Sequence, residues 1–285
     1  NNKMDIHCII DGIASGNKTA NNQKYLRFTW EIKKDVFASK WVLYAKGGEY
    51  RKWYGNLENV IDWSDEARRF YKTNKTSCLL NEKFWFRKGV TYTDLTLKGF
   101  NGRLLPNTAL FDMSGPSIIV EDEAIRNYLL AFYNSIVNTN FLKILNSSFH
   151  IKLNDLLRVP VIYRNEKTVL TKINDIVKIN INISKNDWDS FETSWDFKVH
   201  PFLNKEINPM FLSLETALPS KKIESAFKVW QRYTEIQFAR LKANEEELNR
   251  IFIEIYGLQD ELTPKVEDKD ITIRKANKER DIKSF

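Results

Sequence analysis

The chain has 285 residues, of which 42% are hydrophobic and 13% aromatic. That length can bury the core of one or two domains, and the composition excludes an intrinsically disordered chain. No run approaches the ~18 apolar residues of a membrane span, and the amino terminus lacks the pattern of a secretory signal. We therefore expect a cytoplasmic protein that has no membrane partner.

Cysteine and histidine are too sparse for a disulfide framework or a clustered metal site. The chain has two cysteines, Cys8 and Cys78, and three histidines. We expect both thiols to be reduced and partly buried, as in cytosolic proteins. The chain begins with Asn1 where an initiator methionine would stand, so we expect it to be cut from a longer protein.

The positive charge is confined to the first part of the chain. Residues 1–118 hold 19 Lys and Arg against 12 Asp and Glu, whereas residues 119–285 hold 25 of each kind. The whole excess of +7 therefore lies before residue 119, as expected for a part that faces a polyanion such as nucleic acid. A lysine-rich surface that is simply solvated is the alternative.

The first part of the chain has the pattern of strands and turns. Short aromatic or β-branched runs, separated by glycine and asparagine, occupy residues 6–10, 25–32, 41–44, 83–87, 90–97 and 117–120. They predict a β-rich, loop-rich and mostly antiparallel domain over residues 1–120. Residues 58–70, which are acidic at the start and then apolar at helical spacing, predict one inserted helix.

From residue 121 the apolar period becomes helical, so the chain as a whole is predicted to be α+β. Residues 121–257 form a predicted helical spacer or assembly region, with a second helix over 166–184. Residues 153–162 are expected to be a non-helical connector because of Pro160. A long helix from about residue 220 to Gly257 would span roughly 50 Å and act as a spacer or coiled-coil partner. The charged tail, residues 258–285, is expected to be poorly ordered alone.

The densest candidate for binding chemistry is the segment 45–56, AKGGEYRKWYGN. A Gly-Gly turn lets the backbone approach whatever it faces, and basic residues alternate with aromatic ones directly after it. Such interleaving suits phosphate pairing, base-edge hydrogen bonds and stacking. The candidate DNA-binding residues here are Lys46, Gly47, Gly48, Tyr50, Arg51, Lys52 and Trp53.

Within this segment the basic residues are assigned different roles. Arg51 has the planar fork that can read a guanine, whereas Lys46 and Lys52 are point charges suited to phosphate. The alternative is a hairpin in which Trp53 and Tyr54 are core residues and the cations are solvated.

A second basic and polar cluster could complete a DNA-facing surface. Arg87, Lys88 and Thr91 lie within one short stretch, and Arg103 follows. The alternative is an ordinary surface with no ligand.

No residue pattern predicts catalysis by this chain. There is no glycine-rich nucleotide loop, no metal-ligand spacing, and the three histidines are scattered. Residues 208–211 (NPMF) come nearest to the Asn-Pro-Pro-aromatic segment that holds a flipped adenine, but they lack the second proline. We predict no catalytic residue, no metal and no cofactor in this chain.

The order of several segments resembles the carboxy-terminal half of the PglX-type adenine-specific methyltransferases of bacterial phage-exclusion (BREX) systems. It is similar, more distantly, to single-chain type II restriction–modification enzymes. The most specific segments are 12–17 (GIASGN), 41–56 (WVLYAKGGEYRKWYGN), 111–118 (FDMSGPSI), 187–197 (DWDSFETSWDF) and 247–262 (ELNRIFIEIYGLQDEL). Residues 130–146 and 153–160 resemble the helix and connector that lead out of the target-recognition region of this family.

The resemblance implies a division of labour in the intact enzyme. An amino-terminal domain, missing from this chain, would bind S-adenosylmethionine and methylate adenine N6, so methylation by this chain alone is not expected. The present region would choose the site, with Lys46, Arg51 and Lys52 carried over by motif as DNA-facing residues. The implied partners are double-stranded DNA, the missing methyltransferase domain and other subunits of the defence system.

Two alternatives stay open on the sequence. The apolar stripe of residues 220–256 suits a protein-assembly module that dimerises or captures a partner. A free-standing specificity subunit of a restriction–modification complex is the other alternative, although such subunits usually carry two recognition regions and no internal repeat is visible.

Overall fold

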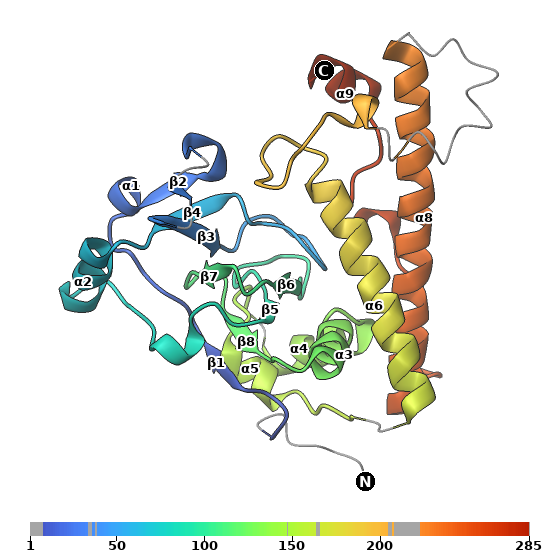
Figure 1. Cartoon of the computed structure of the whole chain (residues 1–285). Coiled ribbons are helices and arrows are strands. Elements are labelled where there is room, and N and C mark those ends of the chain that lie inside the picture. The colour runs from blue at the N-terminus through green and yellow to red at the C-terminus, as the bar shows by residue number, and fades with distance from the viewer. Residues whose placement is uncertain are drawn as a thin grey trace.

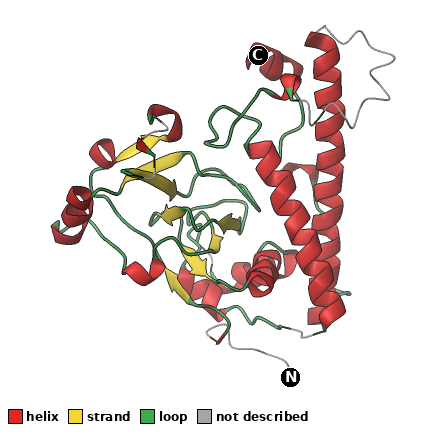
Figure 2. Ribbon diagram, in the orientation of Figure 1, coloured by secondary structure: helices red, strands yellow, loops and turns green. Residues whose placement is uncertain are grey.

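The computed structural model describes residues 8–33, 36–37, 39–146, 148–163, 166–204, 207 and 223–284. Two four-stranded sheets occupy the first part of the chain, and helices follow them (Figure 1, Figure 2). The predicted α+β class is confirmed, including the mostly antiparallel pairing and the long helix near the end.

The two sheets are built from strands that are far apart in the sequence. The first has the order β1-β8-β5-β6 and is antiparallel throughout; its strands are β1 (Gly12–Ala14), β8 (Ser117–Ile119), β5 (Gly89–Thr91) and β6 (Arg103–Leu105). The second has the order β2-β4-β3-β7; its strands are β2 (Leu26–Phe28), β4 (Asn59–Asp62), β3 (Trp41–Ala45) and β7 (Ala109–Phe111). In it, β3 and β7 pair in parallel.

Four of the six predicted runs contain strands, in β2, β3, β5 and β8, while β1, β4, β6 and β7 were not predicted. The run at 83–87 is wrong as a strand. It begins with a 3-10 turn, η4 (Glu82–Phe84), because the Asn81 side chain accepts a hydrogen bond from the Lys83 N–H and starts the turn. In the run at 6–10, the described residues 8–10 form no strand, and residues 6 and 7 lie outside the described part of the chain.

The inserted helix is shorter than predicted. Helix α2 (Asp65–Thr73) begins at Asp65 because the Ser64 side chain caps the Ala67 N–H, and residues 59–62 before it form β4. Among the described residues, the β-rich part also contains the short elements α1 (Asn22–Tyr25), η2 (Thr29–Glu31) and η4.

Behind the sheets the helices follow the predicted order with two differences. They are α3 (Glu123–Tyr133), α4 (Ile136–Leu145), α5 (Leu153–Arg158), α6 (Lys167–Trp188), η5 (Pro201–Leu203), α8 (Ile223–Tyr256), η7 (Asp268–Asp270) and α9 (Lys278–Ser284). The expected connector is wrong, because Pro160 follows α5 instead of preventing it. Ser135 caps α4 and so divides the first helical stretch in two.

The long helix ends where the sequence predicted. Gly257 follows Tyr256 with a φ of +67°, a left-handed conformation that favours glycine and stops a helix. The start expected near residue 220 and the NPMF segment at 208–211 lie outside the described residues.

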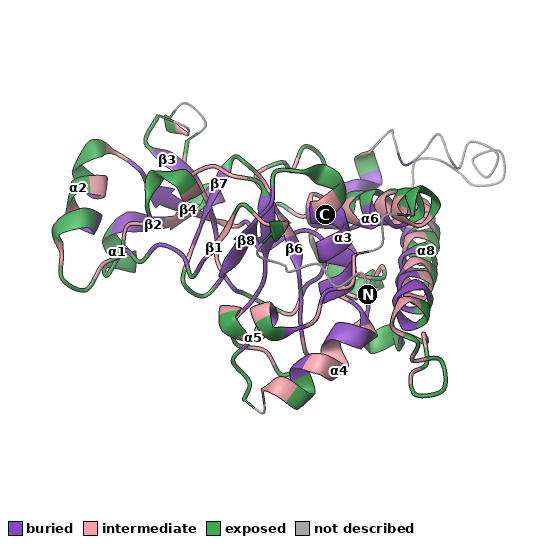
Figure 3. Ribbon diagram, turned by 90° about the horizontal axis from the view of Figure 1, so that it is seen from below, coloured by how far each residue is buried: buried purple, intermediate pink, exposed green. Residues whose placement is uncertain are grey.

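One hydrophobic core joins the sheets to the helices. Val90 and Ile118 of the first sheet, Phe132 of α3 and Phe252 of α8 belong to the same buried cluster. The cluster thus crosses residue 120, where the sequence suggested a domain boundary, and that division stays a prediction. The apolar stripe of α8 is covered by its own chain, as the alternation of buried and exposed positions in Figure 3 shows.

The charged tail is packed against the helices. Val266, Ile271 and Ile273 are each less than a tenth exposed and join the main core cluster. The sequence predicted poor order only for the tail in isolation from the rest of the chain. In the folded chain these three apolar residues anchor it to the helices.

Two further observations concern the cysteines and the absence of membrane-spanning and metal-binding features among the described residues. Cys8 and Cys78 are both exposed, so the expectation that they are partly buried is wrong. Over the part of the chain that the structure describes, no helix combines the length and apolarity of a membrane span, and His, Cys, Asp and Glu nowhere gather in a set of three that could hold a metal ion.

Candidate nucleic-acid interface

Three separate segments of the chain meet where strands of both sheets end. β3 and β7 run parallel and end at Ala45 and Phe111, while β1 ends at Ala14, opposite the first residue of β8. The loops that follow β1, β3 and β7 therefore start side by side. We call residues 15–18, 46–50 and 112–114 the loop edge.

Backbone hydrogen bonds hold the three loops together. The Asn17 N–H donates to the Phe111 carbonyl at 2.8 Å, and the Met113 N–H donates to the Asn17 carbonyl at 3.2 Å. The Asp112 N–H donates to the Ala45 carbonyl at 2.9 Å. The loop edge thus unites the three segments of the first 120 residues that carry the family resemblance.

Two glycines make this close approach possible. A Cβ on Gly16 would lie 2.3 Å from the Asp112 carbonyl, and one on Gly47 would lie 2.6 Å from the Ser114 carbonyl. Gly16 also has a φ of +116°, which side chains rarely adopt.

We expect Gly16→Ala to lower the free energy of unfolding by about 2–4 kcal/mol, because it adds a backbone clash to left-handed strain. Gly257→Ala is the control, since Gly257 has a positive φ but open space around its Cα, and it should cost about 1 kcal/mol. Urea denaturation compares the two variants. Equal losses would show that the loops are not tightly packed at Gly16.

The loop edge presents polar and basic side chains to solvent. Ser15, Lys18, Glu49 and Ser114 are exposed, and Lys46 is half-buried. Across the described residues, neither Lys18 nor Lys46 forms an ion pair. Such cations are free to neutralise phosphates, while hydroxyl and carboxylate groups can bond to base edges.

Tyr50 and Met113 add less polar surface to the same edge. Tyr50 is half-buried, and the Lys98 ammonium lies 5.4 Å from the centre of its ring. Burial raises the pKa of the Tyr50 hydroxyl, so this group stays neutral and can act as a hydrogen-bond donor. Met113 is 45% exposed.

Directly after the loop edge, Arg51 turns into the protein. Its guanidinium donates to Asp187 Oδ2 at 2.6 Å, to the Ser184 carbonyl at 3.1 Å and to the Tyr54 carbonyl at 2.8 Å. It also lies over the Trp188 ring at 5.0 Å. Arg51 is only 6% exposed, so its donors are directed at α6 and its own loop instead of outward.

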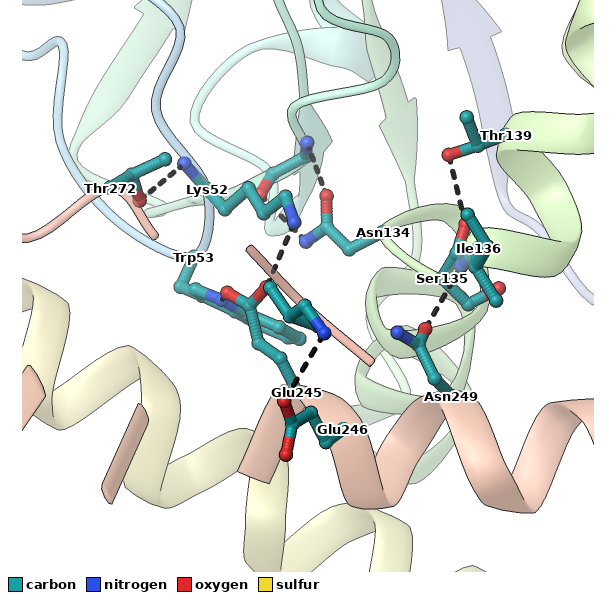
Figure 4. A network of polar contacts seen from close by, with 12 residues as sticks. Lys52, Trp53, Asn134, Ser135, Ile136, Thr139, Glu245, Glu246, Asn249 and Thr272 are labelled. Atoms are coloured by element: carbon teal, nitrogen blue, oxygen red, sulfur yellow. Dashed lines mark hydrogen bonds and ion pairs between the residues drawn. The ribbon is translucent and has the colours of Figure 1, made fainter. Parts of the chain in front are cut away.

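Lys52 and Trp53 are anchored by one carboxylate of the long helix. The Lys52 ammonium lies 2.9 Å from Glu245 Oε2, and the Trp53 indole N–H donates to Glu245 Oε1 at 2.8 Å (Figure 4). Burial lowers the pKa of Lys52, but the attraction of Glu245 outweighs it and leaves that pKa above its ordinary value. The Lys52 N–H also donates to Thr272 of the tail.

Arg103 is fully buried and holds the loop edge from behind. Its donors reach the carbonyls of Gly47 and Arg51 at 3.2 Å each and Asn101 Oδ1 at 2.9 Å. Its Nε has no partner, and no carboxylate pairs with it within the described part of the chain. Burial, together with the charge of Arg51, lowers the pKa of Arg103 to about 9.

The second predicted cluster is not at the loop edge. Arg87 pairs with Glu121, and Lys88 is exposed at the start of β5, whereas the loop edge adjoins its end. Thr91 is buried and donates to the Gly115 carbonyl at 3.1 Å. The structure therefore brings Lys46, Gly47, Gly48 and Tyr50 together at one surface and places Arg51, Lys52, Trp53, Thr91 and Arg103 beneath it.

Sequence reasoning missed the acidic partners in the helical half. Glu245 lies in the buried stripe of α8, four residues after Leu241 and three before Leu248. A carboxylate at such a position needs a partner inside the protein. That pattern could have indicated that Lys52 is structural.

Comparisons with known proteins give two similar sequences. The adenine-specific methyltransferase PglX of Lacticaseibacillus casei (strain Zhang) is 36% identical over 287 aligned residues, which cover 95% of this chain and 23% of PglX. The adenine-specific methyltransferase BrxX of Escherichia coli O9:H4 (strain HS) is 29% identical over 242 aligned residues, covering 84% of this chain and 18% of BrxX. The chain thus spans about a quarter or less of the relatives it matches.

A solved structure shares the fold. The type IIL restriction–modification enzyme MmeI, solved in complex with DNA, matches with a TM-score of 0.51 at 8% sequence identity, over 89% of this chain and 33% of the MmeI chain. No protein-family model matches the chain. Over most of its length, the chain is homologous to a region of the adenine-specific methyltransferases PglX and BrxX.

Proposed function

We propose that this chain is the DNA target-recognition region of an adenine-N6 methyltransferase, and that the loop edge is the surface that meets duplex DNA. The observation that carries the proposal is the convergence of residues 15–18, 46–50 and 112–114 at one exposed edge, where Lys18 and Lys46 form no ion pair with any described residue. A DNA-bound restriction–modification enzyme with the same fold supports it.

The charge distribution also supports the loop edge as the DNA surface, once the basic residues that form ion pairs within the protein are left out of the count. Arg51, Lys52 and Arg87 are neutralised by Asp187, Glu245 and Glu121 of the helical half. That pairing accounts for three of the seven excess positive charges of residues 1–118. The remaining excess includes the two lysines of the loop edge, which are available to phosphates.

Arg103 strengthens the attraction of this edge for anions. A buried cation without a carboxylate acts through a low-dielectric medium, so its field extends to Gly47 and Gly48 more strongly than that of a solvated cation. Through the Gly47 carbonyl it also fixes the loop conformation. Arg103 therefore supports the loop conformation and attracts phosphates at long range, and it does not read bases.

In the longer protein, the proposal assigns methylation to a part outside this chain. That part would bind S-adenosylmethionine and duplex DNA would be the shared substrate, with further defence-system subunits as partners. The alternative assembly role for the stripe of α8 is less well supported, because Phe238, Leu241, Leu248 and Phe252 are buried within the chain. If the chain is instead a free-standing specificity subunit, it would recognise DNA in the same way, and the methylating part would be a separate polypeptide.

The test is the salt dependence of binding to a short mixed-sequence duplex. We expect Lys46→Ala to weaken binding to all sequences about equally and to reduce the slope of log affinity against log salt by about 0.9, as loss of one phosphate contact requires. Lys88→Ala removes the same charge from the far end of β5 and should change the slope much less. Equal effects of the two variants would reject the loop edge as the DNA surface.

A further inference from the structure

A groove beside the loop edge has two strongly exposed apolar side chains in its lining. Residues 96–100, helix α4 and residues 148–151 enclose about 400 Å³. Its floor consists of Phe100, Leu142 and Ile151, which are buried. Its walls include Leu97 and Phe149, which are 81% and 62% exposed.

The exposed walls are held by regular backbone contacts. The Thr96 N–H donates to the Phe149 carbonyl at 2.9 Å, and Leu95 forms an isolated bridge with His150. His150 Nδ1 lies 2.9 Å from Asp94 Oδ2. Leu97 and Phe149 are therefore presented on a formed surface, and adjoining exposed apolar side chains of this kind mark interaction sites.

The charge of the groove indicates the chemistry of its partner. Lys98 and Lys143 line it, both are exposed, and neither forms an ion pair across the described residues. No carboxylate is among the lining residues. The carboxylates of Asp94 and Asp155 bond to His150 and to the lining residue Asn146.

We propose that this groove binds an acidic, amphipathic protein segment that inserts apolar side chains between Leu97 and Phe149. A volume of about 400 Å³ falls within the range of ligand sites, roughly 300–1,000 Å³. An apolar floor suits the helix-in-groove mode of peptide recognition, and the two lysines select carboxylates. DNA fits less well, because its phosphates would meet the apolar side chains of Leu97 and Phe149.

The experiment titrates the whole chain with two helical peptides and follows fluorescence anisotropy. Both peptides carry leucines at positions i, i+3, i+4 and i+7; one has glutamates elsewhere and the other has lysines. We expect saturable binding of the glutamate peptide, weakened at least ~10-fold by Phe149→Asp and by Lys143→Glu. Ile144→Asp is the matched control, because Ile144 is 82% exposed on α4 but does not line the groove.

Three results of the peptide titrations would overturn the proposal. These are equal affinity for both peptides, no binding at the concentrations used, and an effect of Ile144→Asp as large as that of Phe149→Asp. Competition by a short DNA duplex that is lost with Lys143→Glu would also overturn it and would assign the groove to DNA. The groove variants leave Lys46 and Lys18 intact. The result for peptide binding at the groove is therefore independent of the result for DNA binding at the loop edge.

Discussion

Replacing Glu245 with alanine is expected to lower the free energy of unfolding by about 3–5 kcal/mol, the range for breaking one partner of a buried ion pair. The Lys52 ammonium would stay buried without its counter-ion, and the Trp53 indole N–H would lose its acceptor. Trp53 also has a φ of +71°, a strained conformation that its side-chain contacts help to hold. Urea denaturation followed by tryptophan fluorescence measures the loss.

Two controls separate the ion pair from other effects. Glu254→Ala changes an exposed carboxylate on the same helix and should cost less than about 0.5 kcal/mol. The double variant Lys52→Met with Glu245→Gln keeps an acceptor for Trp53 and removes both charges, so it should recover much of the loss. A cost for Glu245→Ala no greater than that for Glu254→Ala would contradict the buried pair.

Arg51→Ala is expected to lower the free energy of unfolding by a similar amount, about 3–5 kcal/mol. It removes the pair with Asp187 and leaves the Tyr54 and Ser184 carbonyls without their donor. Arg51→Lys should recover only part of the lost free energy of unfolding, because an ammonium cannot supply the planar fork of donors or stack over Trp188. Thermal unfolding of the unmodified chain, Arg51→Ala and Arg51→Lys compares their stabilities.

The same variant distinguishes support from base reading. If Arg51 acts only by holding the loop edge against α6, Arg51→Ala weakens binding to cognate and random duplexes by the same factor, measured at a temperature where the variant is folded. A selective loss of ~1–3 kcal/mol on one sequence, with stability unchanged, would restore the base-reading role that the sequence suggested.

Periodicity predicted the helical half well because apolar spacing there reflects one buried face per helix. The end of α8 at Gly257 followed from the preference of glycine for a left-handed stop. The strands were harder, since the unpredicted strands β1, β6 and β7 are only three residues long and take their pairing partners from other segments of the chain. A strand such as β6 is set by its register with β5, which no local pattern contains.

The sequence did not show how the side chains of the candidate site are oriented. The segment around Gly47 is at the surface, yet the chain turns inward at Arg51, where its partners are Asp187 and Thr272. These residues lie more than a hundred positions away in the sequence. Basic residues beside aromatics therefore served here to join the β-rich part to the helices, and the exposed cation Lys18 came from another segment.

Hydrogen–deuterium exchange of the whole chain, with and without a short DNA duplex at low salt, tests the central claim most directly. We predict that DNA slows exchange in residues 15–18, 46–50 and 112–114, and that residues 87–88 and the outer face of α2 are unchanged. Protection confined to residues 87–88, α2 or the helical half, with none at the loop edge, would contradict the account.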